Sequence, residues 1–179
     1  QQAAVVLAAD VTLRSTAPIG PKYLSIAKAQ ELNTAETISF LSMTLHDGNS
    51  VLSSIKATTP EYPLRGKLKL LDLNGQNIEK PTGSPMRGNI WVEQNLIDRF
   101  NISKGDSITL GNERFAVSAV LVDFPDRNDG FLAFAPTVIA NIEDLDAMGV
   151  IQPGSRVVYR QLYSGLENQI DNFVNELQD

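Results

Sequence analysis

The chain has 179 residues, and its 21 Asp and Glu residues against 15 Lys and Arg give a formal net charge of −6 at pH 7. Because clustered Lys and Arg bind phosphate backbones, this acidic balance argues against nucleic acid as a partner. The absence of cysteine excludes a disulfide, a thiol nucleophile and a Cys-ligated metal site, and 42% hydrophobic residues are typical of a globular domain.

The first predicted elements are a strand and a helix. Apolar and polar residues alternate over 10–16, which is the two-residue period of a half-buried strand. Pro18 and Pro21 follow, and Pro21 suits the first turn of a helix because that position needs no N–H donor. Apolar residues at helical spacing extend this helix to about Leu32.

A β-hairpin is predicted next. Segments 36–46 and 50–58 are rich in β-branched and apolar residues, and the Asp-Gly-Asn sequence at 47–49 between them is typical of a turn. The apolar pattern of the first arm changes phase at Phe40 and Leu41. This change indicates either a β-bulge or a strand buried on both faces.

A mostly-β segment follows the two prolines of 59–63, which cannot continue a central strand and therefore mark a boundary. Gly, Asn and Pro residues separate its apolar runs, as expected for short strands joined by turns. The predicted elements are strands at 65–73, 88–92, 107–110 and 113–122 and a short helix at 93–100.

After a polar loop at 123–130, helical spacing returns. The apolar residues that carry it are Val138, Ile139, Ile142, Leu145 and Met148. Gly149 is placed to end this helix. A further strand is predicted at 156–163, and an amphipathic pattern from Gly165 onward predicts a final helix.

The order of the outer elements predicts an α+β fold. Strand, helix, strand, strand, helix and strand make up the split β-α-β layout of a ferredoxin-like sandwich. We therefore expect a ferredoxin-like lobe formed by 1–58 and 128–179, with a second, mostly-β lobe inserted at 59–127.

His46 is the only histidine, so any Ser-His-Asp triad or histidine acid–base scheme must include it. It lies beside Asp47 at a predicted turn, where a histidine is more often a solvated loop residue than a catalytic base. Nucleophile-elbow and P-loop motifs are absent. We expect no catalytic residue and no cofactor, and a hydrolase that uses His46 and Asp47 is the lowest-ranked alternative.

The acidic loop from Asp123 to Gly130 is the best candidate for a metal site, because hard cations bind clustered oxygen ligands. Its spacing fits an EF-hand poorly. Counted from Asp126, Gly130 falls at the fifth position instead of the sixth, and Thr137 stands where the bidentate Glu belongs. A solvated connector is the alternative, and we predict no metal site.

Large apolar side chains gather where the inserted segment returns to the outer one. They are Phe124, Phe131, Leu132 and Phe134. They could line an apolar groove, or they could pack the two lobes together, which is the more common role of apolar residues near a domain boundary. We treat them as a candidate apolar contact surface.

Several motifs in a fixed order resemble the periplasmic core domain of MacB/FtsX-type ABC transporter permeases. Residues 9–15 with Pro18 resemble the A-D-L-x-L-x-S segment that follows the first membrane helix of these permeases. Further stretches similar to the family lie at 62–66, 88–92, 105–106, 115–120, 134–136 and 152–156. Tyr-Pro-Leu-Arg-Gly and Gln-Pro-Gly-Ser-Arg are similar to the YbbP-like branch. The resemblance covers nearly the whole chain.

This resemblance implies a non-catalytic periplasmic domain of a bacterial inner-membrane protein, with a porter-type ferredoxin-like lobe. The partners it implies are flanking transmembrane helices of the same permease and a cytoplasmic ABC ATPase subunit. A periplasmic esterase or lysophospholipase is a further partner suggested by the YbbP-like branch. The expected role is to couple ATP hydrolysis to a periplasmic conformational change, with export or extraction of an apolar or lipid-linked cargo. A periplasmic carrier or chaperone of apolar ligands is the alternative.

Overall fold

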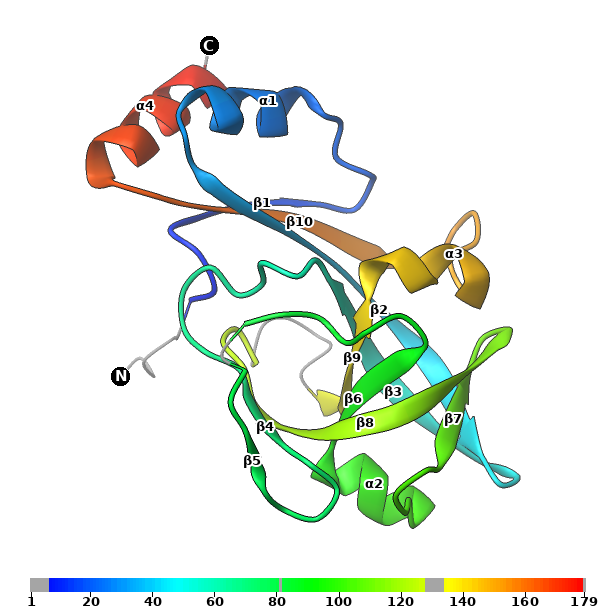
Figure 1. Ribbon diagram of the computed structural model, residues 1–179. Helices are drawn as coiled ribbons and strands as arrows, with labels where there is room; N and C mark the ends of the chain where they lie inside the picture. The colour runs from blue at the N-terminus through cyan, green and yellow to red at the C-terminus, as the bar shows by residue number, and fades with distance from the viewer. Residues whose placement is uncertain (1–6, 81, 128–133, 179) are drawn as a thin grey trace, which may run out of the picture.

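The computed structural model describes residues 7–80, 82–127 and 134–178, which fold into ten strands and four α-helices (Figure 1). The fold is mixed α/β and mostly β. An outer antiparallel sheet carries two helices on one face, and a closed barrel lies beside it. In the described ranges no helix is both long enough and apolar enough to span a membrane.

Four strands form the outer sheet, each antiparallel to its neighbour. In spatial order they are β1 (Val11–Ser15), β10 (Val157–Ser164), β2 (Asn33–His46) and β3 (Asn49–Thr58). The predicted first strand, hairpin and last strand are thus confirmed. The register between β2 and β3 is continuous from Thr37 to His46, which excludes a bulge in this pairing at the phase change.

Two helices cover the end of this sheet that β1 and β10 form (Figure 1). They are α1 (Lys22–Ala29), which follows Pro21 as predicted, and α4 (Glu167–Leu177). Phe173 of α4 and Tyr163 of β10 are completely buried, and their ring centroids lie 4.4 Å apart. These residues form a small separate core with Ala27 and Leu32 from the α1 region.

Six strands close into a barrel. Going round it, β2 pairs with β3, then β9, β6, β8 and β7 follow, and β7 pairs back to β2 through Thr44 and Leu45. The new strands are β6 (Asn89–Glu93), β7 (Ser107–Leu110), β8 (Glu113–Asp123) and β9 (Thr137–Asn141). Closure leaves these strands without a long free edge.

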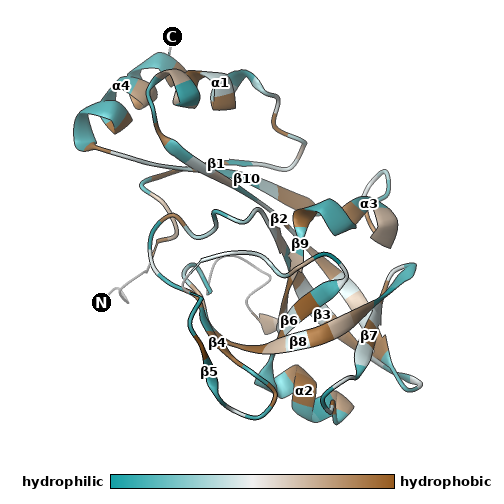
Figure 2. Cartoon of the chain, in the orientation of Figure 1, coloured by the Kyte–Doolittle hydropathy of each residue, from teal (hydrophilic) through white to brown (hydrophobic). Residues whose placement is uncertain are grey.

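The largest core fills the barrel, where Ile55, Ile90, Ile108, Leu110 and Val138 are fully buried. Figure 2 shows hydrophobic residues along the barrel strands and hydrophilic residues at the hairpin tips. Two helices complete this core: α2 (Gln94–Phe100), as predicted, and the short α3 (Leu145–Met148). Two short strands, β4 (Lys69–Leu71) and β5 (Asn77–Ile78), extend the sheet beyond β8.

The helix predicted over 138–148 is wrong in its first half. Thr137–Asn141 is strand β9, a 3-10 turn follows at Ile142–Asp144, and only Leu145–Met148 is α-helical. Four consecutive residues of β9 are buried, because the strand lies between β3 and β6 and faces apolar groups on both sides. An apolar run of this length has no distinguishing period. Gly149 ends α3 in the left-handed conformation, as predicted.

The barrel draws strands from both ranges predicted as lobes: β2, β3 and β9 from the outer range, and β6, β7 and β8 from the inserted one. The division into lobes 1–58 with 128–179 and 59–127 stays a prediction. β2 is the longest strand and belongs to both the outer sheet and the barrel, so it is buried on both sides at Phe40.

Candidate functional site

His46 ends β2 and lies in a polar hollow of about 880 Å³ at the tip of the hairpin. Its Nδ1 lies 2.7 Å from the carbonyl oxygen of Ser107, and the carboxylate nearest its Nε2 is that of Asp106, at 3.9 Å. The Ser107 hydroxyl instead accepts a hydrogen bond from Arg114 at 3.1 Å. Within the described residues, this arrangement gives His46 no serine hydroxyl to activate.

Two of the carboxylates in the acidic loop have basic partners. Asp126 lies 3.3 Å from Lys56 Nζ and accepts a hydrogen bond from the Tyr62 hydroxyl at 2.9 Å. Asp123 lies 3.5 Å from Arg127 Nε. The rest of the loop, 128–130, lies outside the described residues. Among the described residues, no group of three His, Asp or Glu side chains is arranged to hold a metal ion.

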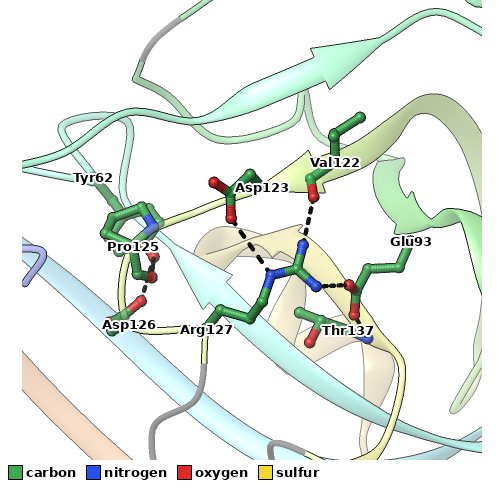
Figure 3. Close-up of polar contacts among 8 residues, drawn as sticks. All are labelled: Tyr62, Glu93, Val122, Asp123, Pro125, Asp126, Arg127 and Thr137. Carbon is green, nitrogen blue, oxygen red and sulfur yellow. Dashed lines mark hydrogen bonds and ion pairs between the residues drawn. The ribbon is translucent and has the colours of Figure 1, made fainter. Parts of the chain in front are cut away.

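Arg127 ties the end of β8 to two other barrel strands (Figure 3). Its guanidinium donates to Glu93 of β6 and to the Val122 carbonyl oxygen. The second carboxylate oxygen of Glu93 accepts from the Thr137 amide of β9 at 2.7 Å. Glu93 is therefore the bridge that fixes the 123–127 turn against both strands.

Phe124 belongs to the interior rather than to an exposed contact surface. It is 5% exposed, and Lys56 Nζ and Arg127 Cζ lie 5.9 and 5.1 Å from its ring centroid. These are cation–π distances, so the ring stabilises both cations of the network. Phe131 and Leu132 lie outside the described residues.

Phe134 is 73% exposed and borders an apolar hollow of about 430 Å³. Strand β2 supplies Phe40 and Leu41 to this hollow, and the 150–157 segment supplies Val150 and Val157. The structure thus separates Phe124 from Phe134: the first packs inside and the second is available for contact.

An apolar surface on the outside of the hairpin was not singled out from the sequence. Met43, Leu45 and Leu52 are each more than 40% exposed, and Met43 lies directly opposite Leu52 on the neighbouring strand. The signal for it is the alternation of Leu41, Met43 and Leu45 along β2, which puts all three on one face of the strand.

Two of the motifs that carry the family resemblance meet in space. Arg65 donates from Nε and Nη2 to the two carboxylate oxygens of Asp10, at 2.9 and 2.7 Å. The amide of Gly165 also donates to Asp10, at 3.1 Å. Hydrogen bonds from Arg65, together with that from Gly165, lower the pKa of Asp10 against the opposing effect of burial, and Asp10 in turn raises the pKa of Arg65.

Comparison with known proteins finds similarity in both sequence and structure. No family model matches the chain. The uncharacterized ABC transporter permease YbbP of Escherichia coli is 28% identical over 173 residues, which are 97% of this chain but 20% of YbbP. The periplasmic region of MacB from Actinobacillus actinomycetemcomitans has the same fold, with a TM-score of 0.54 and 12% identity over 87% of this chain and 72% of that one.

The chain thus spans about a fifth of the length of YbbP, and its fold is that of the MacB periplasmic region. Both comparisons confirm the resemblance drawn from the sequence motifs. The chain therefore resembles one segment of an ABC transporter permease in sequence and the periplasmic region of MacB in fold.

Proposed function

We propose that this domain transmits motion from the membrane part of its permease into the periplasm. Transmembrane helices of the same permease would move the domain, and a cytoplasmic ABC ATPase subunit would supply the energy by hydrolysing ATP. The resulting conformational change would drive export or extraction of an apolar or lipid-linked cargo.

Strand β2 is the observation that carries this proposal. Its first half pairs with β10 in the outer sheet, next to β1 and α4, and its second half pairs with β7 in the barrel. One unbroken strand therefore joins the layer that holds the first strand and the last helix to the barrel (Figure 1). A continuous sheet resists bending at the join, which suits a part that moves as one body.

The lobe division belongs to the same proposal. Strands β1 and β2 run parallel with β10 between them, and α1 connects them, which is a split β-α-β unit. This supports a porter-type, ferredoxin-like lobe made from 1–58 and 128–179 that carries 59–127 as an inserted β-rich lobe.

The test uses the complete permease with its ATPase in lipid nanodiscs. A donor dye is attached at Asn95→Cys on α2 or at Asn172→Cys on α4, both of which are exposed, and acceptor dyes are placed on the lipid headgroups. This chain has no native cysteine, so the dye position is unique once cysteines elsewhere are replaced. We expect ATP to change the energy transfer from both positions. Equal transfer with and without ATP at both positions would overturn the proposal.

Binding of an apolar ligand is the second candidate function, and the hollow beside Phe134 favours it. A fluorescent lipid probe should then bind the permease, and Phe134→Ala should weaken that binding several-fold. An unchanged affinity would remove this candidate. A periplasmic esterase or lysophospholipase stays a proposed partner, and the exposed face with Met43, Leu45 and Leu52 is the surface that such a partner could contact.

A further inference from the structure

Three distant parts of the chain meet at one point, which we name the terminal junction: residues 8–10, Leu64 with Arg65, and Gly165. The carbonyl oxygen of Ala8 accepts from the amides of Leu64 and Arg65, at 2.9 and 2.8 Å. Asp10 then holds both the Arg65 guanidinium and the Gly165 amide. Residues 8–10 are thereby attached both to the segment after β3 and to Gly165, two residues before α4.

The segment 62–66 continues from this junction into the barrel. Tyr62 is completely buried, and its hydroxyl donates to Asp126 at 2.9 Å. Asp126 pairs with Lys56 of β3. One residue further on, Arg127 binds Glu93 of β6 (Figure 3). Polar contacts and short backbone segments together thus connect Asp10 to two barrel strands.

We infer that the terminal junction is a mechanical lock: Asp10 and Arg65 make the barrel follow the two ends of the chain through segment 62–66, in addition to the path through β2. This inference rests on the proposed function, because it names the residues through which the motion passes. Asp10 and Arg65 are positioning residues that act through the segments they hold together.

The geometry of the pair suits this role. Two parallel N–H···O bonds from a guanidinium to a carboxylate fix the relative orientation of the groups as well as their distance. The amide of Gly165 occupies a further acceptor position on the same carboxylate, so the last helix cannot shift without disturbing Asp10. Asparagine has about the same shape but offers one oxygen, so Asp10→Asn removes part of the lock without creating a cavity.

The experiment uses the nanodisc permease with the donor dye on α4 or on α2. In Asp10→Asn we expect the ATP-dependent change in energy transfer to persist at Asn172 on α4 and to fall at least about twofold at Asn95 on α2. Tyr62→Phe, which interrupts the same path one step further on, should reproduce this split. If the signal at Asn95 keeps its full amplitude in both variants, the inference is overturned.

Asp144→Asn is the matched control. Asp144 also pairs with an arginine, Arg87, at 3.1 Å and accepts from a glycine amide, that of Gly88, at 3.0 Å, but both of these partners lie outside segment 62–66. Both dye positions should keep their ATP response in this variant. A loss at Asn95 in the control equal to that in Asp10→Asn would also contradict the inference. If the unsubstituted permease shows no ATP response even at Asn172, the proposed function itself fails and the lock fails with it.

Hydrogen exchange gives a second measurement that does not depend on ATP. Loss of a charge-assisted acceptor should speed exchange of the Gly165 amide about tenfold in Asp10→Asn, while amides inside the barrel change less than about twofold. In Asp144→Asn, exchange should instead become faster at the amide of Gly88. Unchanged exchange at Gly165 in Asp10→Asn would show that the junction does not hold the last helix in place.

Discussion

At the scale of single residues, Asp10 makes the free energy of unfolding of the domain depend on pH in the acid range. Its carboxylate accepts three hydrogen bonds, two from Arg65 and one from Gly165. Those from Arg65 contribute most to lowering its pKa in the folded state. An aspartate in an unfolded chain has a pKa of about 3.9. The stabilisation by Asp10 is therefore present above this pH and is lost as the pH falls through the lower pKa of the folded state.

Asp10→Asn should accordingly lower the free energy of unfolding at pH 6 by about 1 kcal/mol. The expected loss is modest because the side chains of Asp10 and Arg65 are 30% and 49% exposed, so water screens their interaction. The difference between the two proteins should shrink as the pH is lowered below about 4. Urea unfolding between pH 3 and pH 6 measures it. A difference that grows towards acid pH would contradict the assigned pKa direction.

Tyr163 makes the free energy of unfolding depend on pH in the alkaline range. Burial raises the pKa of its hydroxyl, and the nearby negative charge of Glu36 adds to this effect. Because the unfolded tyrosine titrates near pH 10, the stabilisation that Tyr163 provides is complete below about that pH and is lost as the pH rises further. Tyr163→Phe should cost about 1 kcal/mol at neutral pH, since it removes the hydrogen bond to Gln161.

Above pH 10 the unsubstituted protein should lose stability faster than Tyr163→Phe, which urea unfolding between pH 7 and pH 11 would detect. Tyr23→Phe, at a half-buried position on α1, is the control and should change stability by less than about 0.5 kcal/mol. Parallel curves for Tyr163→Phe and the unsubstituted protein across this range would show that the hydroxyl is not protected by burial.

At the scale of elements, α4 is held to the outer sheet mainly by one side chain. Phe173 is completely buried against Tyr163, whereas the next residue, Val174, is only half-buried. Phe173→Ala should therefore destabilise the domain by about 3–5 kcal/mol and free α4 for hydrogen exchange, and Val174→Ala should cost about 1 kcal/mol or less. Equal losses for both variants would mean that α4 contributes little to the core.

Sequence patterns predicted the elements whose packing is one-sided. The alternation in β1 and the amphipathic stripe of α4 indicate which face of each element is buried. The turn residues of the hairpin indicate where its two strands end. β9 was mistaken for helix because it is buried on both faces, and β4 and β5 are too short to carry a period. Closure of the barrel depends on the pairing of β7 with β2, a contact between segments about sixty residues apart that no local pattern encodes.

The candidate site was predicted less completely. The motifs containing Asp10 and Arg65 stood out, but the ion pair joins residues 55 positions apart, and the sequence does not state that they meet. Phe124 and Phe134 looked equivalent as large apolar residues near a boundary, yet one is enclosed by Lys56 and Arg127 and the other is exposed. Only tertiary packing distinguishes the two residues, so neither composition nor spacing could predict which of them is buried.

At the scale of the whole molecule, the outer sheet and the barrel are joined in two ways. The first is covalent, because β2 and β3 belong to both. The second runs from Asp10 through its ion pair with Arg65, along segment 62–65, and through the Tyr62 hydroxyl to Asp126. Two separate connections restrain rotation better than one, because each blocks the axis about which the other could hinge. The domain should therefore move as a single body when its ends are displaced.

The distance between spin labels at Asn95→Cys on α2 and Asn172→Cys on α4 tests this claim most directly. It is measured by double electron–electron resonance in the complete permease with its ATPase, without nucleotide and with ATP trapped. We predict one narrow distance distribution that is the same in both states. A distribution that shifts or broadens when ATP binds would place a hinge inside the domain and contradict transmission by a rigid body.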